Sequence, residues 1–196
     1  PPYSEYDTVI STGEQITSAL LAIALEKISI KARSWLGWQI PIITDKTYGK
    51  SLIEKIKTDN ISKDLEVNQV AIVSGFQGVS SENRITTLGR GGSDTTAVAM
   101  AASFSAVRCD IYTDVDGVYT TDPRIVKSAK KLDIITYEEM LELASQGAKV
   151  LQARSVALAM KYGVNLRVLS SFEDLPGTSI VKEEKNMEKS EISGIA

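Results

Sequence analysis

The sequence predicts an α/β protein in which a mainly parallel sheet is covered by helices on both faces. Strand-like and helix-like segments alternate along the chain, as they do in βαβ units. Residues rich in Gly or Asp follow several of the expected strands, which is where open parallel sheets bind ligands. The chain has 196 residues, of which 43% are hydrophobic, and this size and composition suit one large globular domain.

The first half is expected to contain three strands and one long helix. Each strand is a short run of β-branched or apolar residues, and the helix is rich in Ala, Leu and Ile. The expected strands are residues 8–12, 40–44 and 69–73, the helix is residues 14–31, and residues 79–92 form a turn-rich loop.

The second half is expected to contain three helices and two strands. Acidic residues Glu138 and Glu139 favour a helix start after Thr136, because they complement the helix dipole. Gly163 is a typical helix stop. The expected helices are residues 93–106, 136–147 and 150–162, and the expected strands are residues 109–113 and 165–169.

The absence of His excludes several kinds of chemistry. Without His the chain has no Ser-His-Asp or Cys-His nucleophile pair and no His-containing zinc site. Its single cysteine, Cys109, rules out an internal disulfide, which fits a reducing compartment. Acid–base catalysis near neutral pH would need a carboxylate or Lys with a shifted pKa. The composition therefore favours an enzyme whose reaction needs no general base.

The charge balance and hydropathy argue against two classes of partner. The formal net charge is −3, and the chain lacks the basic stripe that duplex nucleic acid requires. No uninterrupted apolar run reaches the ~18 residues of a membrane span. We therefore expect neither nucleic-acid binding nor membrane insertion.

The segment Leu88–Thr96 carries the strongest local signal for ligand binding. Gly91 and Gly92 allow a ligand to approach the backbone closely, and Ser93 or Asp94 can cap the following helix. Free N–H groups at a helix start bind anions, and Arg90 offers a planar fork for a carboxylate or phosphate. Together with Asp94, the loop suits a zwitterionic amino acid. The alternative interpretation is an ordinary capped helix after a glycine turn.

The segment Thr113–Arg124 follows an expected strand and combines acidic, hydroxyl and aromatic side chains. Its Asp spacing resembles the start of a calcium loop, but Ile125 stands where calcium needs a bidentate Glu, which argues against calcium. The residue types suit a nucleoside, with Arg124 available for a phosphate. The alternative interpretation is a simple turn cluster.

Four stretches together, and in this order, resemble the aspartokinases of the amino-acid kinase family. The resemblance extends from about Ser11 to Ile180, and the run around Thr113–Arg124 is its most specific part. The four stretches are Ser11–Glu14, Gly89–Asp94, Tyr112–Arg124 and Gly147–Leu151. The resemblance implies an αβα sandwich, with the family's first strand missing from this sequence.

The resemblance also implies a reaction and its site. L-Aspartate would be phosphorylated on its side-chain carboxylate by ATP with Mg²⁺, as the entry step to lysine, threonine and methionine. Arg90 and Asp94 would be the catalytic residues, with Arg90 on the substrate carboxylate and Asp94 and Glu14 facing its ammonium group. The implied substrate site is completed by Phe76, Gly91, Gly92 and Ser93, and the implied nucleotide site comprises Thr113, Asp114, Tyr119, Arg124, Lys149 and Val150.

Two departures from the family pattern shape the expected organisation. The family's Gly-rich first strand, whose Lys contacts phosphates, is not found here, so we expect weak or no activity from these residues alone. Residues 1–181 are expected to form the catalytic domain, and residues 182–196 a linker leading to an absent ACT region that would bind an amino-acid inhibitor. A cytoplasmic homo-oligomer is expected.

Two other functions remain open at this point. One is a kinase for another carboxylate amino acid, such as glutamate. The other is a non-catalytic binding or regulatory module with the same fold. Comparing aspartate with glutamate as phosphoryl acceptor would test the alternative of a kinase for another amino acid. Titration with ATP and aspartate would test the alternative of a non-catalytic module.

Overall fold

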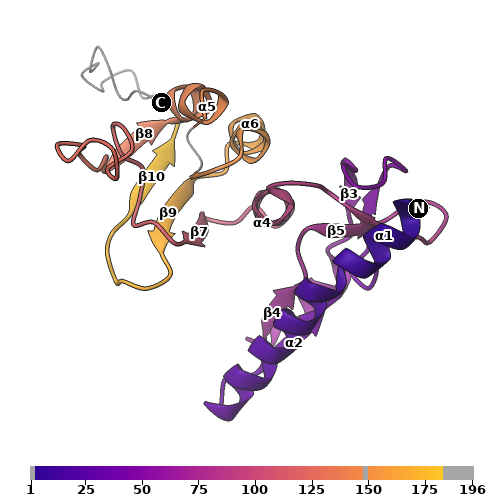
Figure 1. Ribbon diagram of the computed structural model, residues 1–196. Coiled ribbons are helices and arrows are strands. Elements are labelled where there is room, and N and C mark those ends of the chain that lie inside the picture. The colour runs from indigo at the N-terminus through magenta and orange to yellow at the C-terminus, as the bar shows by residue number, and fades with distance from the viewer. Residues whose placement is uncertain (1–2, 148–149, 183–196) are drawn as a thin grey trace. The chain divides into compact units, whose positions relative to one another are not determined.

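A computed structural model describes residues 3–147 and 150–182, and the chain divides into two compact units (Figure 1). The first unit comprises Pro1–Thr96 and the second Ala97–Ala196, so the boundary falls inside helix α4 (Gly92–Ser103). The first unit contains α1 (Tyr3–Ile10), α2 (Thr12–Lys27), β1 (Ala32–Trp35), β2 (Ile42–Thr44), β3 (Ile53–Ile56), α3 (Asp59–Glu66), β4 (Val70–Val73), β5 (Gln77–Val79) and β6 (Ile85–Thr87).

The described residues of the first unit form two sheets. Strands β1 and β4 pair in parallel, with Ala32 opposite Val70. The other sheet has the order β3-β2-β5-β6, in which β2 and β5 are parallel and the outer pairs are antiparallel. Helix α3 is joined to β1 by the Trp35 Nε1–H, which donates to the Asp64 carboxylate at 2.8 Å, and Arg33 lies 4.1 Å from the centre of the Trp35 ring.

The strand expected at residues 8–12 is wrong, because these residues are helical. They fall at the end of α1 and the start of α2, separated only at Ser11, whose φ of −70° and ψ of −17° are also helical. The hydroxyl groups of Thr8, Ser11 and Thr12 donate to backbone carbonyls three or four residues earlier. These bonds satisfy side chains whose β-propensity favoured a strand.

The combined helix Tyr3–Lys27 also bears on membrane insertion. By length and composition alone it is a candidate membrane span, with 17% of its most apolar window buried. A single such helix near the N-terminus is weak evidence. Its polar residues Asp7, Gln15 and Ser18 hydrogen-bond to other parts of the first unit, which identifies this face as one packed against protein.

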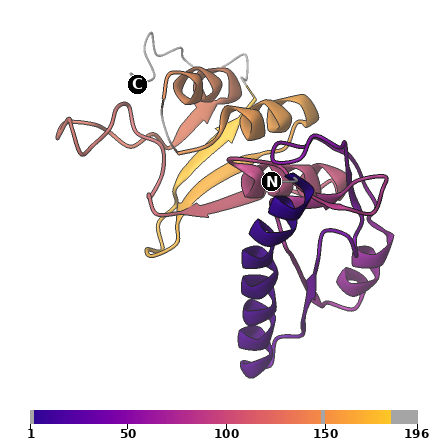
Figure 2. The same cartoon turned by 45° about the vertical axis from the view of Figure 1, so that its right-hand side comes forward.

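In the second unit, the described residues form a four-stranded sheet, and α5 and α6 lie on one of its faces (Figure 2). The sheet order is β7-β9-β10-β8, with β7–β9 and β10–β8 parallel and β9–β10 antiparallel. The core beneath these helices includes Met140, Val156, Val168 and Ile180, each fully buried. The elements are β7 (Cys109–Thr113), β8 (Ile134–Thr136), α5 (Tyr137–Ser145), α6 (Ala153–Tyr162), β9 (Leu166–Ser170) and β10 (Thr178–Val181).

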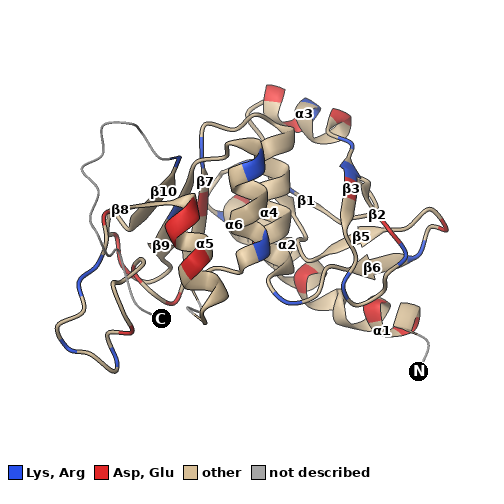
Figure 3. Ribbon diagram, turned by 90° about the horizontal axis from the view of Figure 1, so that it is seen from above, with Lys and Arg blue, Asp and Glu red and all other residues tan. Residues whose placement is uncertain are grey.

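Helix boundaries in the second unit follow the local signals in the sequence. Helix α5 starts after Thr136, as the acidic first turn predicts, and Thr136 also forms a capping box with Glu139, which was not predicted. These acidic residues make the α5 ribbon conspicuously red in Figure 3. Gly163, with a left-handed φ of +66°, ends α6 as expected, although this helix begins at Ala153 rather than at residue 150.

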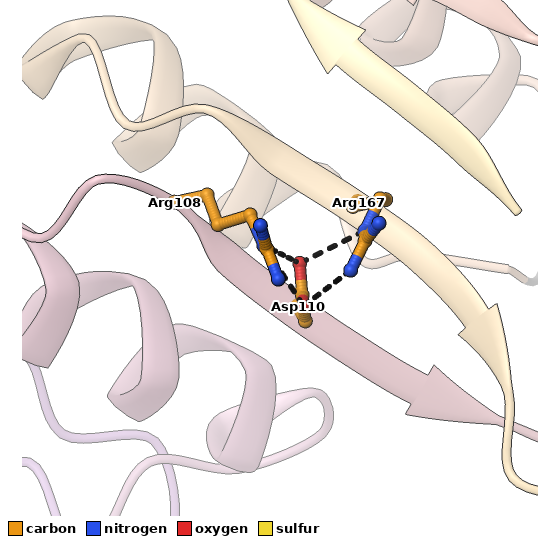
Figure 4. Close-up of polar contacts among 3 residues, drawn as sticks. All are labelled: Arg108, Asp110 and Arg167. Carbon is orange, nitrogen blue, oxygen red and sulfur yellow. Dashed lines mark hydrogen bonds and ion pairs between the residues drawn. The ribbon is translucent and has the colours of Figure 1, made fainter. Parts of the chain in front are cut away.

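An ion cluster joins β7 to β9 in the second unit (Figure 4). Asp110 accepts hydrogen bonds from both Arg108 and Arg167, the latter at 2.7 and 3.1 Å. Partial burial acts to raise the pKa of Asp110, but the two guanidinium groups outweigh burial and lower it below its ordinary value of 3.8.

The predicted fold class is confirmed, because the described residues form an α/β structure in which parallel pairings outnumber antiparallel ones by four to three. The prediction missed several short strands. Strand β6 lies inside the expected loop, and β1, β3, β5, β8 and β10 were also unpredicted, as was helix α3. Strands of three or four residues have too few positions to show a clear alternation.

Candidate functional site

Three segments of the predicted substrate site converge in the first unit. The Ser74 hydroxyl, just beyond β4, lies 3.3 Å from the Glu14 carbonyl and 2.8 Å from the Ser18 hydroxyl. Gln77, which is 1% exposed, donates to the Ser11 carbonyl and accepts from Gln15, both at 3.0 Å. These bonds hold the Glu14 turn of α2 beside the segment that contains Phe76.

Phe76 connects this segment to the glycine loop. Its φ of +66° is left-handed, which is an uncommon and strained conformation for a bulky residue. Strained residues tend to cluster at functional sites. Two hydrogen bonds hold Phe76 in this conformation. Its N–H donates to the Thr96 hydroxyl at 3.0 Å, and its carbonyl accepts from the Leu88 N–H at 2.9 Å. A Cβ added to Gly92 would lie only 2.7 Å from the Phe76 ring, so the close contact requires glycine there.

The loop ends in a helix start that is suited to an anion. Helix α4 begins at Gly92, so Ser93 and Asp94 lie in its first turn and neither caps it, which corrects the expected cap. The N–H groups of Ser93 and Asp94 have no partner within the helix, as is usual for a first turn. Arg90 precedes this turn with an exposed side chain.

Asp94 is half-buried beside these groups. Burial raises its pKa above the ordinary value of 3.8, and among the described residues no side chain or backbone group pairs with its carboxylate. A ligand ammonium group would supply the missing favourable charge. Glu14, Phe76, Gly91, Gly92, Ser93 and Asp94 thus lie on neighbouring segments, with Arg90 in the same loop, and their ligand-binding roles remain predictions.

The predicted nucleotide loop follows β7 in the second unit, as expected. Thr113 ends this strand, and its hydroxyl donates to the Asp114 carboxylate at 3.1 Å. The Tyr119 hydroxyl donates to Asp116 at 3.0 Å, and burial together with this acceptor raises the pKa of Tyr119. The exposed guanidinium of Arg124 binds both carboxylate oxygens of Asp122, at 3.0 and 2.7 Å, so a phosphate would have to compete with this ion pair.

Thr178 holds the base of this loop. Its buried hydroxyl accepts from the Val118 N–H at 2.8 Å and donates to the Leu132 carbonyl at 2.6 Å. Gly117 has a φ of +152°, and a Cβ there would lie 2.6 Å from the Thr178 hydroxyl oxygen. The loop therefore leaves the sheet through a tight turn that only glycine fits.

Of the two remaining residues of the predicted nucleotide site, the structure describes Val150 but not Lys149. Val150 is partly buried and packs against the same core as Val118. Lys149 lies outside the residues that the structure describes. Sequence patterns do not indicate the structural roles of Asp7, Ser74, Gln77 or Thr178, because a single buried polar residue carries no motif of its own.

The sequence matches the amino acid kinase family over residues 2–170, and the chain belongs to this family. It is 54% identical over 194 residues to an aspartokinase of Rickettsia felis and 57% identical over 193 residues to an aspartate kinase of Pseudomonas fluorescens. These alignments cover 98% of this chain but 48% and 47% of the two relatives. The chain thus spans about half the length of the curated relatives it matches, and the resemblance to aspartokinases is confirmed.

Solved structures show the same relationship. The chain is similar to E. coli aspartokinase III in complex with aspartate and ADP, with a TM-score of 0.87, 32% identity and coverage of 95% of this chain and 42% of that one. It is also similar to the same enzyme in complex with lysine and aspartate, with a TM-score of 0.84. A UMP kinase of Bacillus anthracis, at a TM-score of 0.67 and 20% identity, shares the fold.

Proposed function

We propose that the protein containing this chain is an aspartate kinase, which transfers the γ-phosphoryl group of ATP to the side-chain carboxylate of L-aspartate. The observation that carries this proposal is the convergence of Glu14, Phe76 and the Gly91–Asp94 helix start in a chain more than half identical to an aspartate kinase. That site combines anion-binding N–H groups with carboxylates that suit an ammonium group.

The reaction fits a chain without His. The attacking oxygen belongs to a carboxylate that is already ionised at neutral pH, so no base has to remove a proton. A bond forms between this oxygen and the γ-phosphorus as the bond from that phosphorus to the bridging oxygen breaks, and ADP leaves. Phosphoryl transfer of this kind depends on alignment and on positive charge around the phosphates.

Arg90 would select the substrate, and Asp94 would help to orient it. The Arg90 guanidinium matches the two oxygens of the side-chain carboxylate, while Asp94 and Glu14 would face the ammonium group. A site built for such polar contacts can reject an analogue that lacks them by ~10⁴-fold.

In the second unit, the loop Thr113–Arg124 would hold ATP, with Lys149 and Val150 completing the site. Mg²⁺ would be bound mainly through the nucleotide phosphates, since the described residues contain no cluster of three or more candidate metal ligands. This fits an ion that keeps several waters and needs few protein ligands. The ion would neutralise charge on the phosphates during transfer.

The location, domain organisation and self-association of the whole protein can also be proposed. We propose a soluble cytoplasmic enzyme in which residues 1–181 are catalytic and residues 182–196 lead toward a regulatory ACT region, with weak activity from this chain alone. Self-association is proposed as well, supported by exposed apolar residues on α2 that include Ile16, Leu20 and Ile23.

The proposal is tested by aspartate-dependent ADP release and aspartyl-hydroxamate formation with the full-length gene product. L-Aspartate should support both, L-glutamate should support neither, and Arg90→Ala should raise the KM for aspartate by about 100-fold with little change in the KM for ATP. Equal turnover of L-glutamate would favour a different carboxylate kinase. Failure to bind either ATP or aspartate in a titration would favour a non-catalytic module.

A further inference from the structure

Asp7 is a fully buried carboxylate in the first unit, away from the predicted catalytic residues in sequence. It lies on α1 and is 0% exposed. Its Oδ2 atom accepts hydrogen bonds from the backbone N–H groups of Thr87 at 2.8 Å and Gly49 at 3.0 Å. Its Oδ1 atom accepts from the Thr87 hydroxyl at 2.9 Å. Three donors therefore converge on one carboxylate.

These donors lie where the substrate loop begins. Thr87 is the last residue of β6, and the next residues, Leu88 and Gly89, lead directly to Arg90. The Thr87 carbonyl also accepts from the Ser51 N–H at 2.9 Å, so both backbone polar groups of Thr87 are engaged at this point. A Cβ added to Gly89 would lie 2.9 Å from the Gly49 carbonyl, which shows how closely the 47–51 segment packs under the loop.

Asp7 also connects this loop to the helix that carries Glu14. Helix α1 continues through Ser11 into α2 with helical dihedral angles, so Asp7 and Glu14 lie on one nearly continuous helical stretch, two turns apart. A carboxylate that is hydrogen-bonded from three sides is held in a single orientation. Movement of the helix would therefore displace the strand end that supports Arg90.

We propose that Asp7 is a positioning residue for the amino-acid substrate site, because it fixes the Leu88–Ser93 loop relative to the helical turn that carries Glu14. This inference rests on the proposed function for the identity of the substrate. Asp7 does not touch the substrate: it sets the position of groups that do. A shift of about 1 Å in such groups is enough to reduce a rate by about 100-fold.

The test uses the full-length gene product and three variants. Asp7→Ala removes the acceptor, and Asp7→Asn keeps the shape and one carbonyl oxygen that can accept from both N–H groups while its amide faces the Thr87 hydroxyl. Asp64→Ala is the matched control, because Asp64 is also a buried carboxylate of the first unit but bonds to Trp35 and not to the loop. The readouts are KM for aspartate, KM for ATP, and hydrogen exchange of residues 88–93 without ligand.

We expect Asp7→Ala to raise the KM for aspartate by about tenfold or more while the KM for ATP changes by less than about twofold. Residues 88–93 should exchange faster in this variant, Asp7→Asn should restore most of both properties, and Asp64→Ala should change neither. Equal effects of Asp7→Ala and Asp64→Ala on the KM for aspartate, or unchanged exchange at residues 88–93, would overturn the inference. A wild-type protein that does not turn over aspartate would refute the proposed function, and the exchange measurement would still test Asp7.

Discussion

The two predicted ligand loops are held by different kinds of buried polar group. The loop after β6 in the first unit is held by the Asp7 carboxylate, which accepts from three donors. The loop after β7 in the second unit is held by the neutral Thr178 hydroxyl, which accepts one hydrogen bond and donates another. In both cases the group that fixes the loop lies outside the motif that the loop carries.

The difference has an energetic consequence. Each buried donor or acceptor that loses its partner costs about 1–3 kcal/mol, so the number of bonds at each group sets the expected effect of removing it. The first-unit loop should therefore depend more strongly on its support than the second-unit loop does.

Removal of the Asp7 carboxylate should have the largest effect on stability. Asp7→Ala leaves two backbone N–H groups and one hydroxyl without an acceptor, and we expect the free energy of unfolding to fall by about 3 kcal/mol. Urea denaturation followed by circular dichroism measures the change. If Asp7→Ala lowers the free energy of unfolding by less than Thr178→Val does, the contrast between the two loops is contradicted.

Removal of the Thr178 hydroxyl should cost less. Thr178→Val keeps the shape of the side chain but leaves the Val118 N–H and the Leu132 carbonyl unpaired, and we expect a loss of about 2 kcal/mol. The same denaturation experiment applies. Thr178→Ser keeps the hydroxyl and serves as the control, so a Ser variant as unstable as the Val variant would show that the methyl group matters instead.

Asp110 should contribute a smaller, pH-dependent stabilisation. Because its folded pKa is lowered below 3.8, the stabilisation is complete above that value and is lost as the pH falls through the folded pKa. Asp110→Asn should cost about 1 kcal/mol at pH 7, since the ion cluster is partly exposed, and less at pH 2, where protonation of Asp110 weakens the cluster. Thermal melts at both pH values measure this, and an equal loss at both would contradict the ion-pair explanation.

Asp94 should have the smallest effect on stability, and its pH dependence should be opposite in sign to that of Asp110. Burial raises its folded pKa, so the folded state loses stability as the pH rises from 3.8 through that pKa. Asp94→Asn should therefore slightly stabilise the ligand-free protein at pH 7 and leave it unchanged at pH 3. Thermal melts across this range provide the measurement, and a variant destabilised at pH 7 would indicate an unrecognised partner for Asp94.

The segments with strong local signals were predictable from the sequence. The helix start after Thr136, the stop at Gly163 and the strand Cys109–Thr113 follow from local residue types. Residues 8–12 were wrongly assigned as a strand because β-propensity takes no account of tertiary contacts. In the structure, Thr87 donates to Asp7 and Gln77 donates to the Ser11 carbonyl, so packing overrides the local preference.

The residues of the candidate site likewise differ in whether a local sequence signal marks them. Gly91, Gly92 and Asp94 could be proposed from the sequence because glycines and an acid at a helix start form a recognisable pattern, and their binding roles remain predictions. Asp7 and Thr178 could not be identified, since their importance depends on donors that lie 42 to 80 residues away along the chain. Such long-range pairings leave no local spacing to detect.

Hydrogen exchange in the full-length gene product can show whether the first-unit loop binds the amino acid and the second-unit loop binds the nucleotide. L-Aspartate alone should slow exchange in residues 88–94 and leave residues 113–124 unchanged, whereas a non-hydrolysable ATP analogue alone should do the reverse. Protection of residues 113–124 by aspartate, or protection of neither segment by its ligand, would contradict the account.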